Sequence, residues 1–344
     1  MASLFIGDDR SWKPRFDLPS HEQGSCHSRP NDVCRIFEQS RHTHSSGVEN
    51  LQSLKGAKMK VAFIGLGIMG SRMAKNLLNN DVALTVFNRS IDPMRQLEKS
   101  GAIVAKSCQE AVKDADVVFT MLSSPEVIEK IALLENGFIS KMRSNAIWVD
   151  CSTVNPSFSY RESLTAKNHE IRFMDAPVAG TKPHAENAEL VFFVGGEKGD
   201  LKEITPFLNF MGNKIVHVGG TGKGTSYKML VNSLLAQSML AFSEALLLGE
   251  KLGLSKDFLL NNLPNLLVSA PFTKAKAEMI RSDDYEVQFP LELMHKDLHL
   301  VALTAYENNQ PLLLVNLAKE LYANAKRSGF GRKDFAAIYK FLSE

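Results

Sequence analysis

Short apolar runs alternate with stretches of helical periodicity over most of this chain. Residues 61–64 form an apolar run typical of a strand buried on both faces, and residues 71–80 then place apolar residues at helical spacing. The alternation repeats, which predicts an α/β fold with a doubly wound, mostly parallel sheet. Further strands are expected at residues 82–87, 102–104, 116–122, 147–150, 171–175, 190–196 and 214–218.

The pattern changes after residue 221. Residues 225–252 contain no proline and are rich in Leu, Ala and Met, so they predict one helix of about 40 Å. We therefore expect a sheet domain over residues 59–221 and an all-α domain over residues 222–344, joined by this helix. Further helices are expected at residues 256–263, 272–281, 293–308, 312–328 and 335–342.

Apolar side chains occur nearly all round the long helix. A helix that is apolar on every side is buried within its domain or against another subunit. We therefore expect a homodimer or homotetramer that assembles through the C-terminal helical domain. The apolar positions are Met229, Leu230, Leu234, Leu235, Met239, Leu240, Leu246 and Leu247.

Residues 1–58 sustain no apolar period. Their eight Lys/Arg and seven Asp/Glu argue against a mitochondrial transit peptide, and no apolar segment marks a signal peptide. We expect a disordered extension or a mis-assigned start, with the functional protein beginning near Met59. Cys26, Cys34, His42 and His44 are too irregularly spaced to predict a metal site.

Composition narrows the class of protein. The 344 residues are 44% hydrophobic and 23% charged, as in a soluble globular protein of two domains. A net charge of +2 offers no electrostatic case for nucleic acid or membrane as the main partner, and no uninterrupted apolar run is long enough to span a bilayer. The four cysteines form no CxxC pair, so neither a disulfide framework nor a structural zinc site is indicated. We expect a cytoplasmic protein.

A glycine-rich turn between the first strand and its helix suggests the chemistry. Gly65 allows the tight turn, Gly67 lets the backbone approach a pyrophosphate, and Gly70 lets helix and strand pack closely. The helix N-terminus offers free N–H groups to the phosphates. Strand, turn and helix in this order predict a Rossmann-type dinucleotide site that includes Leu66, Ile68 and Met69, although an ordinary glycine-rich turn has the same letters.

The end of the second strand bears on the choice of cofactor. NAD-binding sites usually place an acidic residue there, but this chain has Asn88, Arg89 and Ser90. A cationic side chain and a hydroxyl suit a 2′-phosphate, so NADP(H) is preferred and NAD(H) stays possible. Alternatively, Arg89 only stacks on the adenine or faces solvent. The end of the fourth strand, Met121, Leu122 and Ser123, is assigned to the same cofactor site.

Two further segments follow predicted strands at the sheet edge where such folds bind ligands. Ser152 and Thr153 offer hydroxyl and N–H groups to a carboxylate or to the nicotinamide amide, or they simply cap a helix. Gly180 and Thr181 present N–H groups to an anion and Lys182 adds a positive charge, unless the segment is only a sharp turn with a solvated lysine.

Lys228 and Asn232 lie near the start of the long helix, four residues apart and so on one face. A lysine on an otherwise apolar helix at a domain junction suits a proton donor to a substrate carbonyl, with Asn232 orienting the lysine or the substrate. The alternative is a lysine whose amine reaches solvent beside an ordinary helix Asn.

Together, the motifs GLGIMG, VFNRS, DCSTVNP, DAPVAGTK and HKDL, with Lys228, resemble the β-hydroxyacid dehydrogenase family over residues 59–343. The resemblance implies that Lys228 is the catalytic acid/base, and that Ser152, Gly180 and Thr181 hold the substrate carboxylate. It also implies that Lys296 lies beside nicotinamide and substrate, oriented by Asp297.

Two departures narrow the branch. Val231 stands where 3-hydroxyisobutyrate dehydrogenases typically have Asn, and Thr181 and Lys182 replace part of their GGxxGA turn. Both resemble the glyoxylate/succinic semialdehyde reductases, so we expect NADPH-dependent reduction of a small aldehyde acid. The alternatives are an NAD-dependent 3-hydroxyisobutyrate dehydrogenase and, in another class, an NADP(H)-binding sensor or scaffold without turnover. Imine reductases usually lack the lysine that Lys228 matches.

Overall fold

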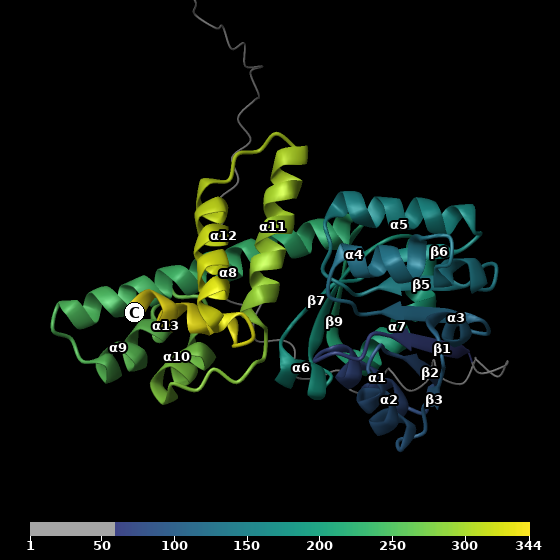
Figure 1. Cartoon of the computed structure of the whole chain (residues 1–344), viewed down its shortest axis with the longest axis horizontal. Coiled ribbons are helices and arrows are strands. Elements are labelled where there is room, and N and C mark those ends of the chain that lie inside the picture. Colours follow the sequence, from purple (N-terminus) through teal and green to yellow (C-terminus); the bar gives the residue numbers. More distant parts are fainter. Residues whose placement is uncertain (1–58) are drawn as a thin grey trace, which may run out of the picture. The chain divides into compact units, whose positions relative to one another are not determined.

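The computed structural model describes residues 59–344. The expected extension lies outside this range, and so do Cys26, Cys34, His42 and His44. Within the described part of the chain, no group of three or more His, Cys, Asp or Glu side chains is placed to hold a metal ion. Figure 1 shows two regions, a strand-containing one in purple to teal and a helical one in green to yellow.

Six parallel strands form the main part of the sheet, in the order β3-β2-β1-β4-β5-β6. Their carboxyl ends align, because Ile64 pairs with both Phe87 and Thr120, and Asp150 pairs with both Thr120 and Asp175. The loops that leave these strands therefore meet at one edge. The strands are β1 (Lys60–Ile64), β2 (Ala83–Phe87), β3 (Ile103–Val104), β4 (Val117–Thr120), β5 (Ile147–Asp150) and β6 (Arg172–Asp175).

Three strands extend the sheet beyond β6, and two of them, β8 (Leu190–Gly195) and β9 (Gly212–Gly219), run in the opposite direction to β6. β8 runs antiparallel to β6 and to the short β7 (Val178–Ala179), and β9 runs parallel to β8. The prediction of a mostly parallel doubly wound sheet is confirmed. The sequence pattern does not reveal the reversal, since an apolar strand reads the same in either direction.

Side chains of each central strand alternate between two cores. In β1, Val61 and Phe63 pack against α1 (Gly70–Asn79), α2 (Ile91–Glu98) and α7 (Lys198–Met211). Ala62 and Ile64 pack on the other face against α3 (Cys108–Val112), α5 (Pro156–Asn168) and the segment that begins with α4 (Pro125–Ile128). Burial on both faces explains why these strands are continuous apolar runs. The helices α5 and α7 were not singled out from the sequence.

Glu162 of α5 is an exception in this core. It is fully buried, neither carboxyl oxygen has a hydrogen-bond partner within the described residues, and burial raises its pKa well above the usual value. The folded protein therefore holds this side chain neutral. An unfolded glutamate ionises near pH 4.5, so above that pH folding must take up a proton.

We expect the free energy of unfolding to fall as pH rises above this value, by up to about 1.4 kcal/mol per pH unit from this group. Glu162→Gln should flatten the dependence, because glutamine carries no titrating proton. Urea unfolding between pH 4.5 and 8 measures it, with the exposed Lys167→Gln on the same helix as control. An unchanged slope in Glu162→Gln would show that Glu162 is ionised in the fold.

The long helix α8 (Lys223–Lys251) begins directly against the sheet. A Cβ on Gly224 would lie 2.2 Å from the Phe193 carbonyl oxygen, so only glycine permits this approach. The carboxylate of Asp175, at the end of β6, accepts hydrogen bonds from Gly222 N (2.7 Å) and Thr225 N (2.8 Å), which satisfies free N–H groups of the first turn. The first two turns of α8 are therefore fixed to the carboxyl edge of the sheet.

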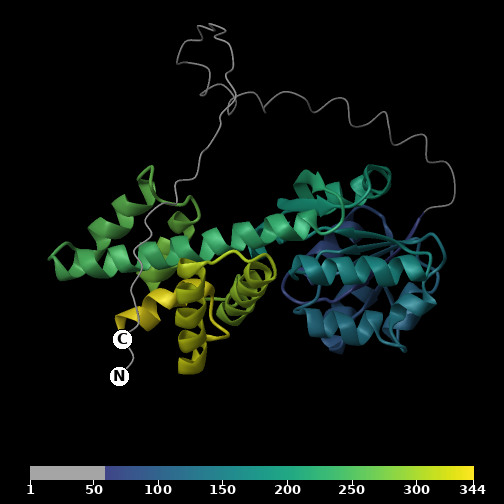
Figure 2. The ribbon, with the colours of Figure 1, turned by 90° about the horizontal axis from the view of Figure 1, so that it is seen from above.

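Beyond its first turns, α8 is the central helix of the C-terminal region (Figure 2). Met239, Leu246, Leu298 and Tyr322 are fully buried in one core shared with the helices that follow. Those helices are α9 (Lys256–Asn262), α10 (Thr273–Ser282), α11 (Leu291–Glu307), α12 (Leu313–Ala325) and α13 (Ile338–Ser343), with single turns between some of them.

Among residues 59–344, α8 is the one helix long and apolar enough to cross a bilayer, judged by length and composition alone. Polar residues interrupt its sequence, so it does not stand out as a continuous apolar run. Its buried side packs against α11, α12 and β8, as in the core helix of a globular fold, so this property is weak support for a membrane span.

Candidate active site

The glycine turn has the shape of a phosphate cradle. Gly65 has φ 96°, and a Cβ there would lie 2.3 Å from the Met121 carbonyl oxygen. A Cβ on Gly70 would lie 2.0 Å from the Gly65 carbonyl oxygen. At Gly67, by contrast, no other atom lies within 4 Å of the Cβ position. The turn therefore leaves open space at Gly67, before the N-terminus of α1, as a bound pyrophosphate requires.

Asn88 has a structural contact at the end of β2. Its Oδ1 accepts a hydrogen bond from Leu66 N (3.0 Å), and its Nδ2 donates to the Ser90 carbonyl oxygen (3.1 Å). The side chain thus ties the glycine turn to the neighbouring strand. Arg89 and Ser90 are exposed, and Arg89 forms no ion pair within residues 59–344. Both are accessible to a ribose or a 2′-phosphate at this edge.

A cleft lies between the glycine turn and the helical region. The strand-containing side contributes four backbone segments to it, and the helical side contributes α8, the segment before α11, and α11 itself. Its lining residues are Gly67, Ile68, Met69, Gly70, Met121, Leu122, Ser123, Thr153, Val178, Gly180, Lys228, Asn232, Gln288, Phe289, Pro290, Leu293, Lys296 and Asp297.

Lys228 is the buried cation of this cleft. Its side chain is only 8% exposed because the second turn of α8 places it between the sheet edge and α11. Burial lowers its pKa to about 8; the Asp297 carboxylate opposes this decrease and the Lys296 ammonium adds to it. An amine with this pKa gains and loses a proton close to neutral pH, as a general acid or base must.

Asp297 connects the other polar groups. Asn232 Nδ2 donates to Asp297 Oδ2 at 2.6 Å, and Lys296 Nζ lies 2.7 Å from Asp297 Oδ1. Lys296 Nζ also donates to the Thr153 carbonyl oxygen at 2.6 Å, across the cleft. Asn232 Oδ1 is buried and has no hydrogen-bond partner within the described residues. An unsatisfied acceptor in a cleft is available to a ligand hydroxyl.

Ser152 lies behind the cleft rather than in its lining. It is buried, its hydroxyl donates to Asp150 Oδ1 (2.6 Å), and it accepts from Leu122 N (2.9 Å). Burial raises the pKa of Asp150 to about 6, and the hydrogen bonds from Ser152 and Thr120 oppose this increase. These contacts hold in place the strand ends that bear Leu122 and Thr153. A serine at this position suits either this structural role or substrate binding, so residue type alone does not distinguish the two. The alternative of a helix cap at Ser152 or Thr153 is wrong, because the N-cap of α5 is Asn155, directly before Pro156.

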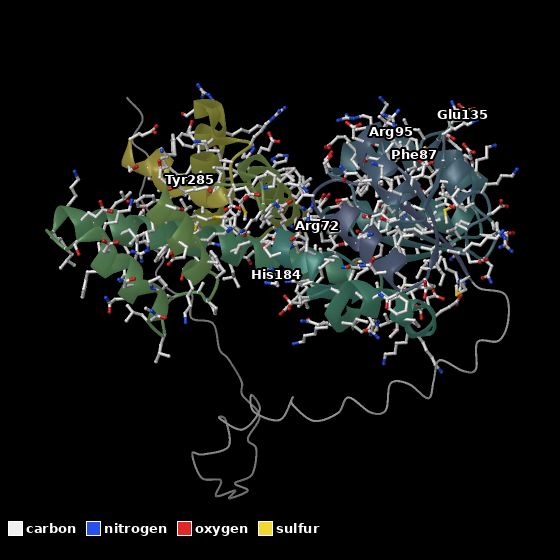
Figure 3. The ribbon with its side chains drawn as sticks, turned by 90° about the horizontal axis from the view of Figure 1, so that it is seen from below. Arg72, Phe87, Arg95, Glu135, His184 and Tyr285 are labelled. Carbon is white, nitrogen blue, oxygen red and sulfur yellow. The ribbon has the colours of Figure 1, made fainter. Side chains whose placement is uncertain are left out.

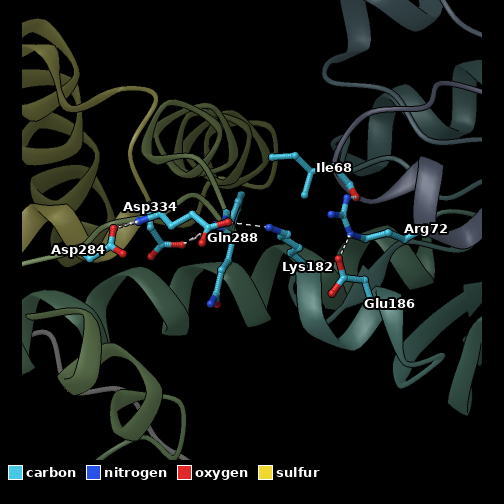
Figure 4. A network of polar contacts seen from close by, with 9 residues as sticks. Ile68, Arg72, Lys182, Glu186, Asp284, Gln288 and Asp334 are labelled. Atoms are coloured by element: carbon cyan, nitrogen blue, oxygen red, sulfur yellow. Dashed lines mark hydrogen bonds and ion pairs between the residues drawn. The ribbon is translucent and has the colours of Figure 1, made fainter. Parts of the chain in front are cut away.

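In the turn at Gly180, too, only some of the predicted substrate-binding residues line the cleft. Gly180 has φ 123° and lines the cleft. Thr181 instead begins α6 (Lys182–Glu186), and its N–H donates to His184 Nδ1 at 3.2 Å. Lys182 Nζ pairs with Glu286 Oε1 at 2.7 Å, so this lysine bridges to the helical region (Figure 4). The predicted substrate contacts of Ser152, Thr181 and Lys182 stay predictions.

The wall made by Gln288, Phe289, Pro290 and Leu293 was missed from the sequence, as was Val178. The helix was expected to begin at residue 293, but α11 begins at Leu291 with Pro290 before it. An available signal for Gln288, Phe289, Pro290 and Leu293 was distance along the chain, since they precede Lys296 by three to eight positions, within about two helical turns.

A phosphate-cradling turn, an adjacent amine that titrates near neutrality and a half-buried cleft define a nicotinamide-dependent oxidoreductase site. The family model described as the NAD binding domain of 6-phosphogluconate dehydrogenase matches residues 60–219. The model described as NAD-binding of NADP-dependent 3-hydroxyisobutyrate dehydrogenase matches residues 222–342. The chain belongs to the β-hydroxyacid dehydrogenase family of NAD(P)-dependent enzymes, as its motifs indicated.

Similar proteins include glyoxylate/succinic semialdehyde reductases and 3-hydroxyisobutyrate dehydrogenases. Glyoxylate/succinic semialdehyde reductase 1 of Arabidopsis thaliana is 33% identical over 282 residues, which cover 81% of this chain and 97% of that protein. A probable mitochondrial 3-hydroxyisobutyrate dehydrogenase of Dictyostelium discoideum is 35% identical over 300 residues, or 83% and 91% of the two chains. The structure of Mycobacterium tuberculosis 3-hydroxyisobutyrate dehydrogenase with L-serine has a TM-score of 0.76 at 29% identity, covering 83% of this chain and 99% of that one.

Proposed function

We propose that this protein is an NADPH-dependent reductase of small aldehyde acids of the glyoxylate or succinic semialdehyde type. The observation that supports it best is the buried Lys228 amine, which faces the cleft beside the glycine turn and has a pKa of about 8. An aldehyde carbonyl in this cleft is within reach of both a proton donor and a cofactor.

The chemistry divides between the cofactor and these side chains. When bound, a reduced nicotinamide supplies the hydride that the aldehyde carbon accepts. The Lys228 ammonium donates its proton to the carbonyl oxygen, which completes the alcohol, and the neutral amine regains a proton from solvent. Asn232 Oδ1 accepts from the hydroxyl that forms, because no other group occupies that acceptor within the described residues.

The substrate carboxylate in this proposal is held by Lys296 and the Gly180 turn, which both line the cleft. Ser152, Thr181 and Lys182 also have partners within the protein, and their contacts with the substrate carboxylate stay predictions. Lys296 is anchored by Asp297 and Thr153, which places its positive charge opposite the glycine turn.

The test is a direct assay of the full chain. We expect rapid oxidation of NADPH with glyoxylate or succinic semialdehyde. The relatives named 3-hydroxyisobutyrate dehydrogenase support a second candidate, NAD-linked oxidation of that hydroxy acid. Preference for NADH and methylmalonate semialdehyde would select the second candidate. Cofactor binding without turnover of any of these substrates would favour the remaining alternative, an NADP(H)-binding sensor or scaffold.

Arg89→Asp should shift cofactor preference towards NADH. Arg89 is exposed at the end of β2 and lacks an ion-pair partner within the described residues, so it is free to bind a 2′-phosphate, which an aspartate would repel. We expect the ratio of kcat/KM for NADPH to that for NADH to fall by at least about tenfold, equal to roughly 1.4 kcal/mol. Lys75→Asp, on α1, is the control for a general change of charge. The role assigned to Arg89 fails if the two variants have the same ratio.

The proposal includes a homo-oligomer. The outward face of α8 bears Leu230 and Leu234, 60% and 65% exposed, and Leu248 lies on the same side farther along the helix, with exposed Leu252 directly after its end. Exposed leucines at both ends of one helix face suit a second copy of the chain. We expect light scattering to give a dimer or tetramer for the wild type and a smaller species for Leu234→Glu. A monomeric wild type would contradict this arrangement.

We also propose the cytoplasm as the location of the protein. Imaging of the full chain with a C-terminal fluorescent tag tests this, and an organellar pattern would reject it.

A further inference from the structure

One wall of the cleft is a short segment that enters α11. Residues 284–290, here called the cleft strap, contribute Gln288, Phe289 and Pro290 to the lining. The strap lies between the last turn of α10 and the helix that bears Lys296 and Asp297. Its position therefore limits the space available in front of these polar groups.

The cleft strap is paired with the C-terminal segment 331–335. Asp334 N donates to the Tyr285 carbonyl oxygen at 3.1 Å, and Phe335 N donates to that of Phe289 at 2.9 Å. Leu291 N donates to the Lys333 carbonyl oxygen at 2.9 Å. Figure 3 labels Tyr285 in the helical region, and Arg72 and His184 in the strand-containing region that faces it.

The Asp334 carboxylate lies at the centre of this pairing. It is 0% exposed, and its Oδ2 accepts from the N–H groups of Gln288 (3.1 Å) and Phe289 (3.0 Å). Its Oδ1 accepts from Lys276 Nζ at 2.8 Å and from Ala336 N at 3.0 Å. Lys276 is itself only 3% exposed. Figure 4 shows Asp334 beside Gln288.

The strap has a second side-chain tether, which is weak by comparison. Glu286 pairs with Lys182 of α6 at 2.7 Å, but the Glu286 side chain is 69% exposed. Exposed ion pairs contribute little, whereas buried charge-assisted hydrogen bonds to backbone N–H groups are strong. Asp334 therefore determines where the strap lies.

We propose that Asp334 is a positioning residue that fixes Phe289 in the cleft wall and thereby sets the length of aldehyde acid that the cleft accepts. It is absent from the lining and acts through the two N–H groups of the strap. The part of this inference that concerns substrate length rests on the proposed function. The part that concerns the tether is independent of it.

Two double variants separate the tether from charge and folding. Lys276→Met with Asp334→Leu replaces the buried ion pair by apolar side chains of similar size, a change that proteins often tolerate, but it removes the acceptor of the strap. Lys276→Gln with Asp334→Asn is also uncharged, yet the oxygen of the introduced asparagine still accepts from the strap while its amide group donates to the introduced glutamine. Both variants lose the acceptor of Ala336 N, but only the first also releases the N–H groups of Gln288 and Phe289.

We expect the Met/Leu variant to exchange the amide hydrogens of Gln288 and Phe289 faster than the wild type. We also expect its kcat/KM ratio of succinic semialdehyde to glyoxylate to rise on the order of tenfold, mainly through KM, because the loosened wall admits the longer substrate. The Gln/Asn variant should keep the wild-type exchange and ratio. In both variants, the pH dependence that reports Lys228 should stay unchanged.

The proposal would be overturned if both variants changed amide exchange and the kcat/KM ratio equally, since charge or packing would then be the cause. It would also be overturned if the Met/Leu variant kept the amide exchange and the kcat/KM ratio of the wild type. A wild type that reduces neither aldehyde refutes the proposed function instead. Amide exchange in the two variants then still supports or rejects the tether.

Discussion

Lys228→Met should lower kcat for aldehyde reduction about 10³-fold, which is the usual contribution of a general acid. Methionine fills the volume of the buried stem without offering a proton. NADPH binding should change little, because the glycine turn belongs to β1 and α1 and does not depend on the α8 side chain. Steady-state kinetics and a fluorescence titration with NADPH measure the two effects.

Lys228→Arg provides the matched control. The guanidinium keeps the positive charge but does not release its proton near neutral pH, so this variant should be almost as slow as Lys228→Met. If either variant remains within about tenfold of the wild type, a water or another side chain supplies the proton.

Asp297→Asn should move the alkaline limb of the reduction rate to lower pH by about one unit. Protonated Lys228 is the active form, so the wild-type rate should fall as pH rises through about 8. The Asp297 carboxylate raises the pKa of Lys228, and its loss leaves burial and Lys296 less opposed. At pH 8 the rate should therefore fall about fivefold, and the loss should approach tenfold at higher pH.

The charge of Lys296 has the opposite effect. Its ammonium lowers the pKa of Lys228, so Lys296→Met should move the alkaline limb of the kcat profile to higher pH. This shift is expected even if the substitution also raises KM. Profiles of kcat against pH for both variants distinguish an electrostatic effect from a loss of structure. Shifts in the same direction would contradict the assigned coupling.

Part of this site could be predicted from short-range sequence patterns. The three glycines, Lys228 and Asn232 meet structural needs that involve only a few neighbouring residues, namely a tight turn, a close backbone approach and a shared helix face. All of them line or shape the cleft. The position of Asn88 was also foreseen, but its contact with Leu66 N shows a structural task that residue type alone does not reveal.

The remainder depends on contacts between distant segments. Whether Ser152 faces a ligand or Asp150 depends on one side-chain rotation, and both arrangements satisfy a hydroxyl equally well. Lys182 pairs with Glu286, which is 104 residues away. Phe289 carries no polar group that suggests a function, and Asp334 acts on it through backbone atoms. Sequence patterns do not encode such distances.

The pKa of about 8 at Lys228 has a consequence for the direction of metabolic flux. Near neutrality, appreciable fractions of the protein hold the amine with and without its proton, so the acid needed for reduction and the base needed for oxidation coexist. By microscopic reversibility, one lysine then serves both directions. The cell's ratios of reduced to oxidised cofactor and of aldehyde to alcohol, rather than the enzyme, would decide which way the reaction runs.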